Sequence, residues 1–163
     1  MSGGDNGTTR VSRGVIWRIG LLLGLVAVVL LIACSRLTKD WNVRLVNSQG
    51  KAIELRVPVA QTEAERTKGL SGLSELPMDG GMLFVFPDEG RVPFWMKDTS
   101  LPLSIAFIDA NGRIVDIQDM EPLSEDIHFS SSDFQCALEM SQGYFARNGI
   151  EVGDRVMLRM DKQ

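Results

Sequence analysis

The sequence is poor in the residues on which most catalytic and metal sites depend. It holds two cysteines, Cys34 and Cys136, and one histidine, His128. A zinc site usually needs several nitrogen or sulfur ligands at ordered spacing, so one histidine beside carboxylates does not predict a metal centre. The sequence also lacks the Gly-x-Ser-x-Gly motif of hydrolases, a calcium-binding EF-hand loop and a phosphate-binding glycine loop. It therefore gives no reason to expect a metal or a cofactor.

The two cysteines also exclude a disulfide framework. They do not form a C-x-x-C pair, and if Cys34 is modified, Cys136 has no partner within the chain. Cys136 lies in an apolar segment with no basic neighbour that would lower the pKa of its thiol. We expect a buried structural residue there.

Positive charge is scarce over most of the chain. Residues 1–35 carry a net charge of +2, from Arg10, Arg13 and Arg18 against Asp5. The remaining residues carry 14 Lys and Arg against 20 Asp and Glu, a net charge of −6. A nucleic-acid-binding domain is expected to gather basic residues on one face. The acidic balance argues against nucleic acid as a partner.

The N-terminal segment has the pattern of an export signal. Residues 19–33 form an apolar run of 15 residues, which is short for a bilayer span of about 20 residues. Leu31-Ile32-Ala33-Cys34 then resembles the lipobox of bacterial lipoproteins, in which the cysteine receives the lipid. These features predict a signal or anchor segment over residues 1–33, lipidation at Cys34 and a tether over residues 34–41.

An uncleaved N-terminal anchor is the alternative interpretation of the same segment. In both cases the arginines precede the apolar run, and the positive-inside bias sends the C-terminal part across the membrane. We therefore expect a membrane-anchored protein of the cell envelope, with its folded domain on the extracytoplasmic side, as in the periplasm.

Residues 42–160 predict one β-rich domain. Alternating or continuous apolar segments predict strands over residues 42–46, 52–59, 82–86, 103–108, 113–117, 135–140 and 156–160. Asn111-Gly112 between two such segments is a strong hairpin signal, and residues 121–133 read as an acidic loop. Six to eight short strands predict a mainly β (α+β) fold, a small closed or nearly closed β-barrel with one or two short helices.

Helical structure is expected at two places. Thr62 and Glu65 form the pattern of a capping box, and Gly69 suits the end of a helix over residues 63–68. A second helical stretch is expected over residues 142–148. Between these elements, the predicted core consists of Met82, Leu83, Phe84, Val85, Ile105, Phe107, Val115, Leu138 and Val156.

Several segments, in order, resemble the family called domain of unknown function 192. They are residues 65–70 (ERTKGL), 81–87 (GMLFVFP), 94–99 (FWMKDT), 102–103, 107–112, 137–139 and 149–154. The resemblance covers roughly residues 43–158 and implies a compact β-rich barrel that often follows a leader. It implies no catalytic residues, because the family has no agreed activity. The chain departs from many relatives at Asp98, where they have asparagine.

Six residues are candidates for a binding site. The block Phe94 to Thr99 places an aromatic ring beside a cation and a hydroxyl, and strand alternation would send Trp95 and Lys97 to the face opposite Asp98. Glu139 interrupts an apolar strand, and a charge there normally has a partner, for which Arg66 is a candidate. The predicted ligand-binding residues are Arg66, Trp95, Lys97, Asp98, Thr99 and Glu139.

Two interpretations of these residues remain open. In the structural one, an Arg66–Glu139 ion pair fastens the helix to the barrel. In the functional one, Trp95 forms the apolar wall of a small pocket whose charged residues fix the polar end of a ligand.

Three functions follow as hypotheses: an envelope module that binds a small molecule, a glycan or an envelope protein; an envelope enzyme that uses Glu139 with Lys97 or Arg66; and a surface scaffold without a pocket.

Overall fold

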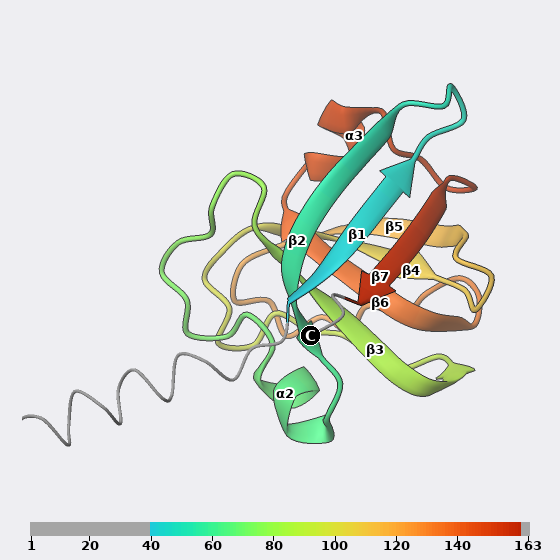
Figure 1. Ribbon diagram of the computed structural model, residues 1–163. Coiled ribbons are helices and arrows are strands. Elements are labelled where there is room, and N and C mark those ends of the chain that lie inside the picture. Colours follow the sequence, from blue (N-terminus) through green and yellow to red (C-terminus); the bar gives the residue numbers. More distant parts are fainter. Residues whose placement is uncertain (1–39, 161–163) are drawn as a thin grey trace, which may run out of the picture. The chain divides into compact units, whose positions relative to one another are not determined.

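The computed structural model describes residues 40–160, and the predictions for the signal or anchor segment 1–33 and for Cys34 lie outside them. The elements, in chain order, are β1 (Asp40–Val46), β2 (Ala52–Ala60), α2 (Glu63–Lys68), β3 (Gly81–Gly90), β4 (Leu103–Ile108), β5 (Ile114–Met120), β6 (Phe134–Ser141), α3 (Tyr144–Asn148) and β7 (Arg155–Met160) (Figure 1). Strand β1 begins at Asp40, two residues before the predicted start of the β-rich domain at residue 42. Within residues 40–160, no helix is long and apolar enough to cross a membrane.

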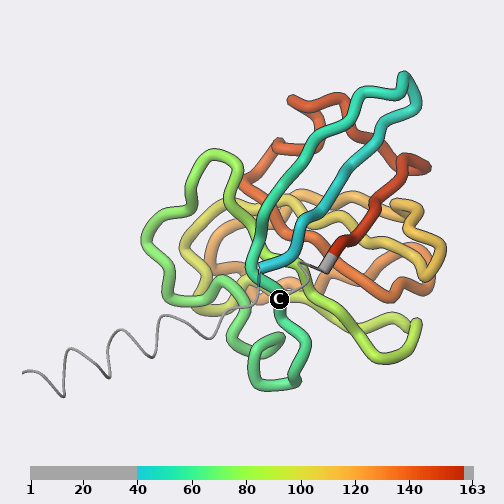
Figure 2. Tube along the Cα trace, viewed as in Figure 1, coloured from blue at the N-terminus to red at the C-terminus, as the bar shows by residue number. Residues whose placement is uncertain are grey.

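The strands form one seven-stranded sheet in the order β5-β4-β6-β3-β2-β1-β7. Neighbouring strands are antiparallel except β2 and β3, which are parallel over a short contact at Val59↔Leu83. Figures 1 and 2 show β1, β2 and β7 crossing the remaining strands at a steep angle. The mainly β fold with two short helices is therefore confirmed.

Two tight turns fix the register of the hairpins. Between β1 and β2, the side-chain oxygen of Asn47 accepts hydrogen bonds from the backbone N–H groups of Gln49 and Lys51, at 3.1 and 2.8 Å. Between β4 and β5, Asp109 does the same for Asn111 and Arg113, and Gly112 supplies the positive φ of 73°. These are the turn residues that the sequence indicated at Asn111-Gly112.

The predicted closure of the barrel is not confirmed, because the sheet is not closed. Within residues 40–160, its two edge strands approach each other at one isolated antiparallel bridge, between Arg113 and Arg155. The Ile114 N–H donates to the Asp154 carbonyl at 2.9 Å, and the Val156 N–H donates to the Gly112 carbonyl at 2.7 Å. Both edge strands start at this bridge and run away from it in opposite directions, so they do not overlap far enough to form a ladder.

The core consists of two clusters on opposite sides of β4 and β6, which are buried over almost their whole length. The aliphatic cluster includes Val43, Leu45, Val57, Leu83, Ala106, Ile114, Leu138, Met140, Phe145 and Val156. The aromatic cluster includes Phe84, Phe86, Phe94, Met96, Leu103, Ile105, Phe107, Phe134 and Ala137. Because successive strand residues point to opposite faces, neighbours such as Ala137 and Leu138 belong to different clusters.

Most of the predicted core is confirmed, with one group of corrections. Leu83, Phe84, Ile105, Phe107, Leu138 and Val156 are buried. Met82, Val85 and Val115 are only partly buried. Strand β3 continues to Gly90, beyond the predicted strand over residues 82–86, with a register shift after Val85 that the apolar pattern does not reveal.

Candidate functional site

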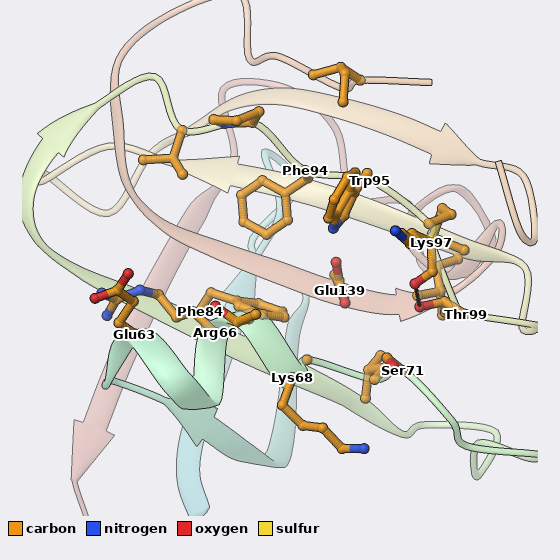
Figure 3. A pocket seen from close by; sticks show the side chains of 18 of the residues that line it. Glu63, Arg66, Lys68, Ser71, Phe84, Phe94, Trp95, Lys97, Thr99 and Glu139 are labelled. Atoms are coloured by element: carbon orange, nitrogen blue, oxygen red, sulfur yellow. Dashed lines mark hydrogen bonds between the residues drawn. The ribbon is translucent and has the colours of Figure 1, made fainter. Parts of the chain in front are cut away.

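A cavity of about 560 Å³ lies beside the aromatic cluster, between α2, the segment before β4, and strands β3 and β6 (Figure 3). Its apolar wall consists of Leu70, Phe84, Phe86, Val92, Pro93, Phe94, Trp95, Met96, Leu103 and Ile127. Its polar lining consists of Glu63, Arg66, Thr67, Lys68, Ser71, Lys97, Thr99 and Glu139. Aromatic side chains thus meet a small set of charged groups, which is the usual composition of a small-molecule site.

The wall formed by α2 is fixed by the predicted capping box. The Thr62 hydroxyl accepts a hydrogen bond from the Glu65 N–H at 3.2 Å, and the Glu65 carboxylate accepts from the Thr62 N–H at 2.8 Å. Hydrogen bonds from the backbone N–H groups of Thr62 and Gln61 lower the pKa of Glu65. Glu65 is therefore occupied in capping, while Glu63 and Arg66 line the cavity.

Arg66 fastens the helix to the sheet through backbone contacts. Its Nη1 donates to the Val85 carbonyl at 3.0 Å and also to the Gln61 carbonyl, and its guanidinium lies 4.9 Å from the centre of the Phe86 ring. The Arg66–Glu139 ion pair of the structural interpretation is not found, because no ion pair joins these side chains in the described part of the chain. Both residues nevertheless line one cavity, as the pocket hypothesis predicts.

The opposite wall is held by pairing between two loop segments. Phe94 and His128 exchange backbone hydrogen bonds of 3.0 and 2.8 Å, the Met96 N–H donates to the Ser124 carbonyl, and the Leu123 N–H donates to the Thr99 carbonyl. Phe94 and Met96 consequently point into the core, and Trp95 and Lys97 face outward to the cavity rim. The Lys97 ammonium lies 5.4 Å from the centre of the Trp95 ring.

The last two residues of that block differ in their position. Thr99 is buried and lines the cavity, with its hydroxyl 3.5 Å from the Lys97 carbonyl, to which it donates. Asp98 is exposed and is not among the lining residues. Its φ of 58° is in the left-handed region, which aspartate tolerates better than most residues, so Asp98 forms the turn after the rim.

Glu139 is the central polar group of the cavity. It extends from β6 between buried Leu138 and Met140, is only 5% exposed, and points into the cavity (Figure 3). Among residues 40–160, no hydrogen bond or ion pair involves its carboxyl group. Burial raises the pKa of this carboxyl from 4.5 to about 8. At neutral pH the group is therefore mostly protonated, and it can both donate and accept a hydrogen bond.

A glycine makes the close packing behind Glu139 possible. A Cβ atom at Gly81 would come within 2.2 Å of the Glu139 carbonyl oxygen and 2.4 Å of the Met140 sulfur. Only glycine fits this position, where β3 begins beside β6. The Gly81-Met82 segment of the sequence match thus has a direct structural role.

Sequence reasoning missed several lining residues. Glu63 and Lys68 lie on the same short helix as Arg66, and the helical spacing of Glu63 and Arg66 could have indicated a shared face. Val92 and Ile127 come from segments without periodicity, and Ile127 reaches the rim only through the loop pairing around His128. No local signal in the sequence indicates that contact.

His128 and Cys136 have structural surroundings. The Nδ1 atom of His128 lies 3.0 Å from the Gln118 side-chain oxygen, and the Gln118 amide donates to Asp116, so this network attaches the loop to β5. Cys136 is buried, and burial raises the pKa of its thiol to about 11. No group of three or more His, Cys, Asp or Glu within the described residues is arranged to hold a metal.

The family and structural comparisons agree with this architecture. A putative transcription regulator (R01717) from Sinorhizobium meliloti 1021 has a crystal structure similar to this chain, with 34% identity and a TM-score of 0.72 over 74% of this chain and 95% of that chain. A protein of unknown function from Novosphingobium aromaticivorans DSM 12444 is 31% identical, with a TM-score of 0.69 over 72% of this chain and 84% of that chain. No curated protein matches the sequence. Residues 44–158 match the DUF192 model, described as Uncharacterized ACR. The chain therefore belongs to the DUF192 family.

Proposed function

We propose that this protein is anchored in a membrane of the cell envelope and that its β domain binds a small molecule in the Glu139 cavity. The observation that carries the proposal is the buried carboxyl of Glu139, which points into the cavity without a partner among the described residues. Because this carboxyl lines the cavity, a ligand there can accept a hydrogen bond from it or donate one to it.

The structural interpretation of Glu139 has lost its main support. In that interpretation, an Arg66–Glu139 ion pair attaches α2 to the sheet. Arg66 instead contacts two backbone carbonyls and the Phe86 ring. The helix thus has an attachment that does not use Glu139. The presence of the cavity also argues against a scaffold that acts only through its surface.

The anchor rests on the leader sequence. An apolar segment of 15 residues followed by Leu31-Ile32-Ala33-Cys34 supports lipidation at Cys34. Labelling cells with a palmitate analogue should mark the wild-type protein and not Cys34→Ala. Equal labelling of the two proteins would contradict the lipid anchor.

Ligand binding is tested with the soluble domain, residues 39–163. These residues form one compact unit, and the similar Sinorhizobium meliloti chain consists almost entirely of the matched domain. A thermal-shift screen against envelope metabolites and glycans should find compounds that raise the melting temperature. A ligand at a hundredfold its dissociation constant stabilises the folded state by about 2.7 kcal/mol.

The matched control in this screen is Trp95→Ala. A ligand of the cavity should lose most of its stabilising effect in this variant, whereas a compound bound elsewhere would stabilise both proteins equally. A screen without any compound that distinguishes the two proteins would contradict the proposed function.

Catalysis is a second candidate, favoured by one observation. A carboxyl whose pKa is about 8 can exchange a proton near neutral pH, and Lys97 lines the same cavity as a positive group. Any reaction found for ligands from the screen should then disappear in Glu139→Gln. Turnover that persists in this variant would exclude Glu139 as the acid or base.

A further inference from the structure

We infer that the ligand of this cavity is an organic anion, with an apolar body against the aromatic wall and its negative group between Glu139, Lys97 and Trp95. The inference rests on the proposed function and adds the chemical class of the ligand.

The polar groups around this position offer mainly donors. The indole nitrogen of Trp95 can only donate, as can the ammonium of Lys97, and both lie on the side of the cavity that faces the Glu139 carboxyl (Figure 3). Burial keeps Glu139 protonated at neutral pH, so its carboxyl adds an O–H donor from the floor. A ligand group that satisfies three converging donors has to supply acceptor oxygens. A carboxylate does this best, because hydrogen bonds to a charged acceptor are stronger than neutral ones.

The charges around the cavity favour the same sign of ligand. The charged residues that line it are Arg66, Lys68 and Lys97, against Glu63 and the mostly protonated Glu139. Of these, Lys68 points its ammonium away from Glu139 (Figure 3). Strands β3 and β4, which flank Glu139 in the sheet, place Met82 and Ile105 beside it and add no charge. A local excess of positive charge in an acidic domain attracts an anion.

A cationic ligand meets two obstacles at the same place. It would bring a like charge next to Lys97, and it would need Glu139 to lose its proton. The remaining wall is apolar. Phe84 and Phe94 pack edge to face, with ring centres 5.3 Å apart, and Met96 and Leu103 continue this surface.

Binding of an anion at this place is coupled to the protonation of Glu139. If the anion binds only when Glu139 carries its proton, the apparent dissociation constant rises as the protonated fraction falls. With a pKa of about 8, that fraction drops about tenfold between pH 7 and pH 9. Glu139→Gln should abolish this dependence, because an amide donates a hydrogen bond at every pH.

The charge preference is tested by calorimetry on residues 39–163 with three probes that share a phenyl group. The probes are phenylacetate, phenylacetamide and 2-phenylethylamine. Phenylacetate should bind most tightly at pH 7 and about tenfold more weakly at pH 9. Lys97→Met should weaken its binding, whereas Lys51→Met, on the distant β1–β2 turn, should not.

The outcomes separate the two proposals. Tighter binding of 2-phenylethylamine, or phenylacetate binding that strengthens from pH 7 to pH 9, would overturn the anion inference and leave the cavity as a ligand site. The absence of phenylacetate binding would also overturn the inference. Only the failure of the thermal-shift screen as well would remove the proposed function.

Discussion

The two sides of strands β4 and β6 differ in how completely they are filled. On the aliphatic side, Leu138 and Met140 pack among Val43, Leu45 and Leu83, and all five are buried. On the aromatic side, the next residue of β6 after Ala137 is Glu139, an acid at a position that an apolar residue could fill. That side also contains the cavity.

This difference separates structural from functional requirements within one sheet. A domain whose needs were only structural would gain stability by placing an apolar side chain at Glu139, because an uncharged core carries no desolvation cost. The aliphatic side meets that requirement and the aromatic side does not. We infer that the aromatic side keeps its acid and its empty volume for a ligand.

The largest expected effect is a dependence of stability on pH that resides in Glu139. Its pKa is about 8 in the folded protein and near 4.5 in the unfolded chain, so the unfolded chain binds fewer protons between these values. The free energy of unfolding therefore falls as the pH rises from 4.5 to 8, by about 5 kcal/mol from this group. Urea melts should show Glu139→Gln gaining stability relative to wild type over that window.

The control for this prediction is Glu125→Gln in the exposed loop, which should follow the wild-type pH profile. A Glu139→Gln protein whose profile is parallel to that of the wild type would show that the carboxyl has its ordinary pKa. The aromatic side would then be no different from the aliphatic side in its electrostatics.

Truncations on the two sides should separate stability from binding. Phe84→Ala should cost about 3–5 kcal/mol and Leu138→Ala about 2–5 kcal/mol, because both remove buried apolar volume. Only Phe84 lines the cavity, so only Phe84→Ala should weaken the binding of a ligand found in the screen. Denaturant melts and calorimetry on the same variants measure the two effects. A Leu138→Ala protein that folds but loses ligand would contradict the division.

A smaller effect is expected at the cap of α2. Thr62→Ala removes the hydroxyl that accepts from the Glu65 N–H, and loss of such a cap costs about 1 kcal/mol. Amide exchange should become faster in α2 and stay unchanged in α3, whose N-terminus has no side-chain cap. Faster exchange in both helices would indicate global destabilisation.

The smallest effect on stability is expected at the rim. Trp95 is 52% exposed, so Trp95→Ala should change the free energy of unfolding by no more than about 0.5 kcal/mol. The same variant should bind ligand much less tightly. A large loss of stability would instead make Trp95 part of the core.

Much of this architecture follows from local sequence signals. The helix over Glu63–Lys68 is predicted within its observed bounds because Thr62 and Glu65 cap it by contacts only three residues apart. The open edge between β5 and β7 could not be predicted, since it depends on how strands far apart in the sequence diverge from the bridge at Arg113. Local patterns carry no information on that angle.

The candidate site also combines features that the sequence predicts with features that it does not predict. Trp95, Lys97 and Thr99 follow from one short block, and Glu139 follows from being a charge in an apolar strand. The lack of a partner for Glu139 among residues 40–160 could not be foreseen, because Arg66 contacts the Val85 carbonyl instead. That contact depends on how α2 packs on β3.

The pKa of Glu139 is measured most directly by titrating its carboxyl with carbon NMR in the ligand-free domain. We expect a midpoint of about 8, because the group is buried and no partner stabilises its charged form within the described residues. A midpoint near the ordinary value of 4.5 would mean that the carboxyl is hydrated or paired in solution. That result would contradict the unpartnered acid on which both the binding cavity and the anion inference rest.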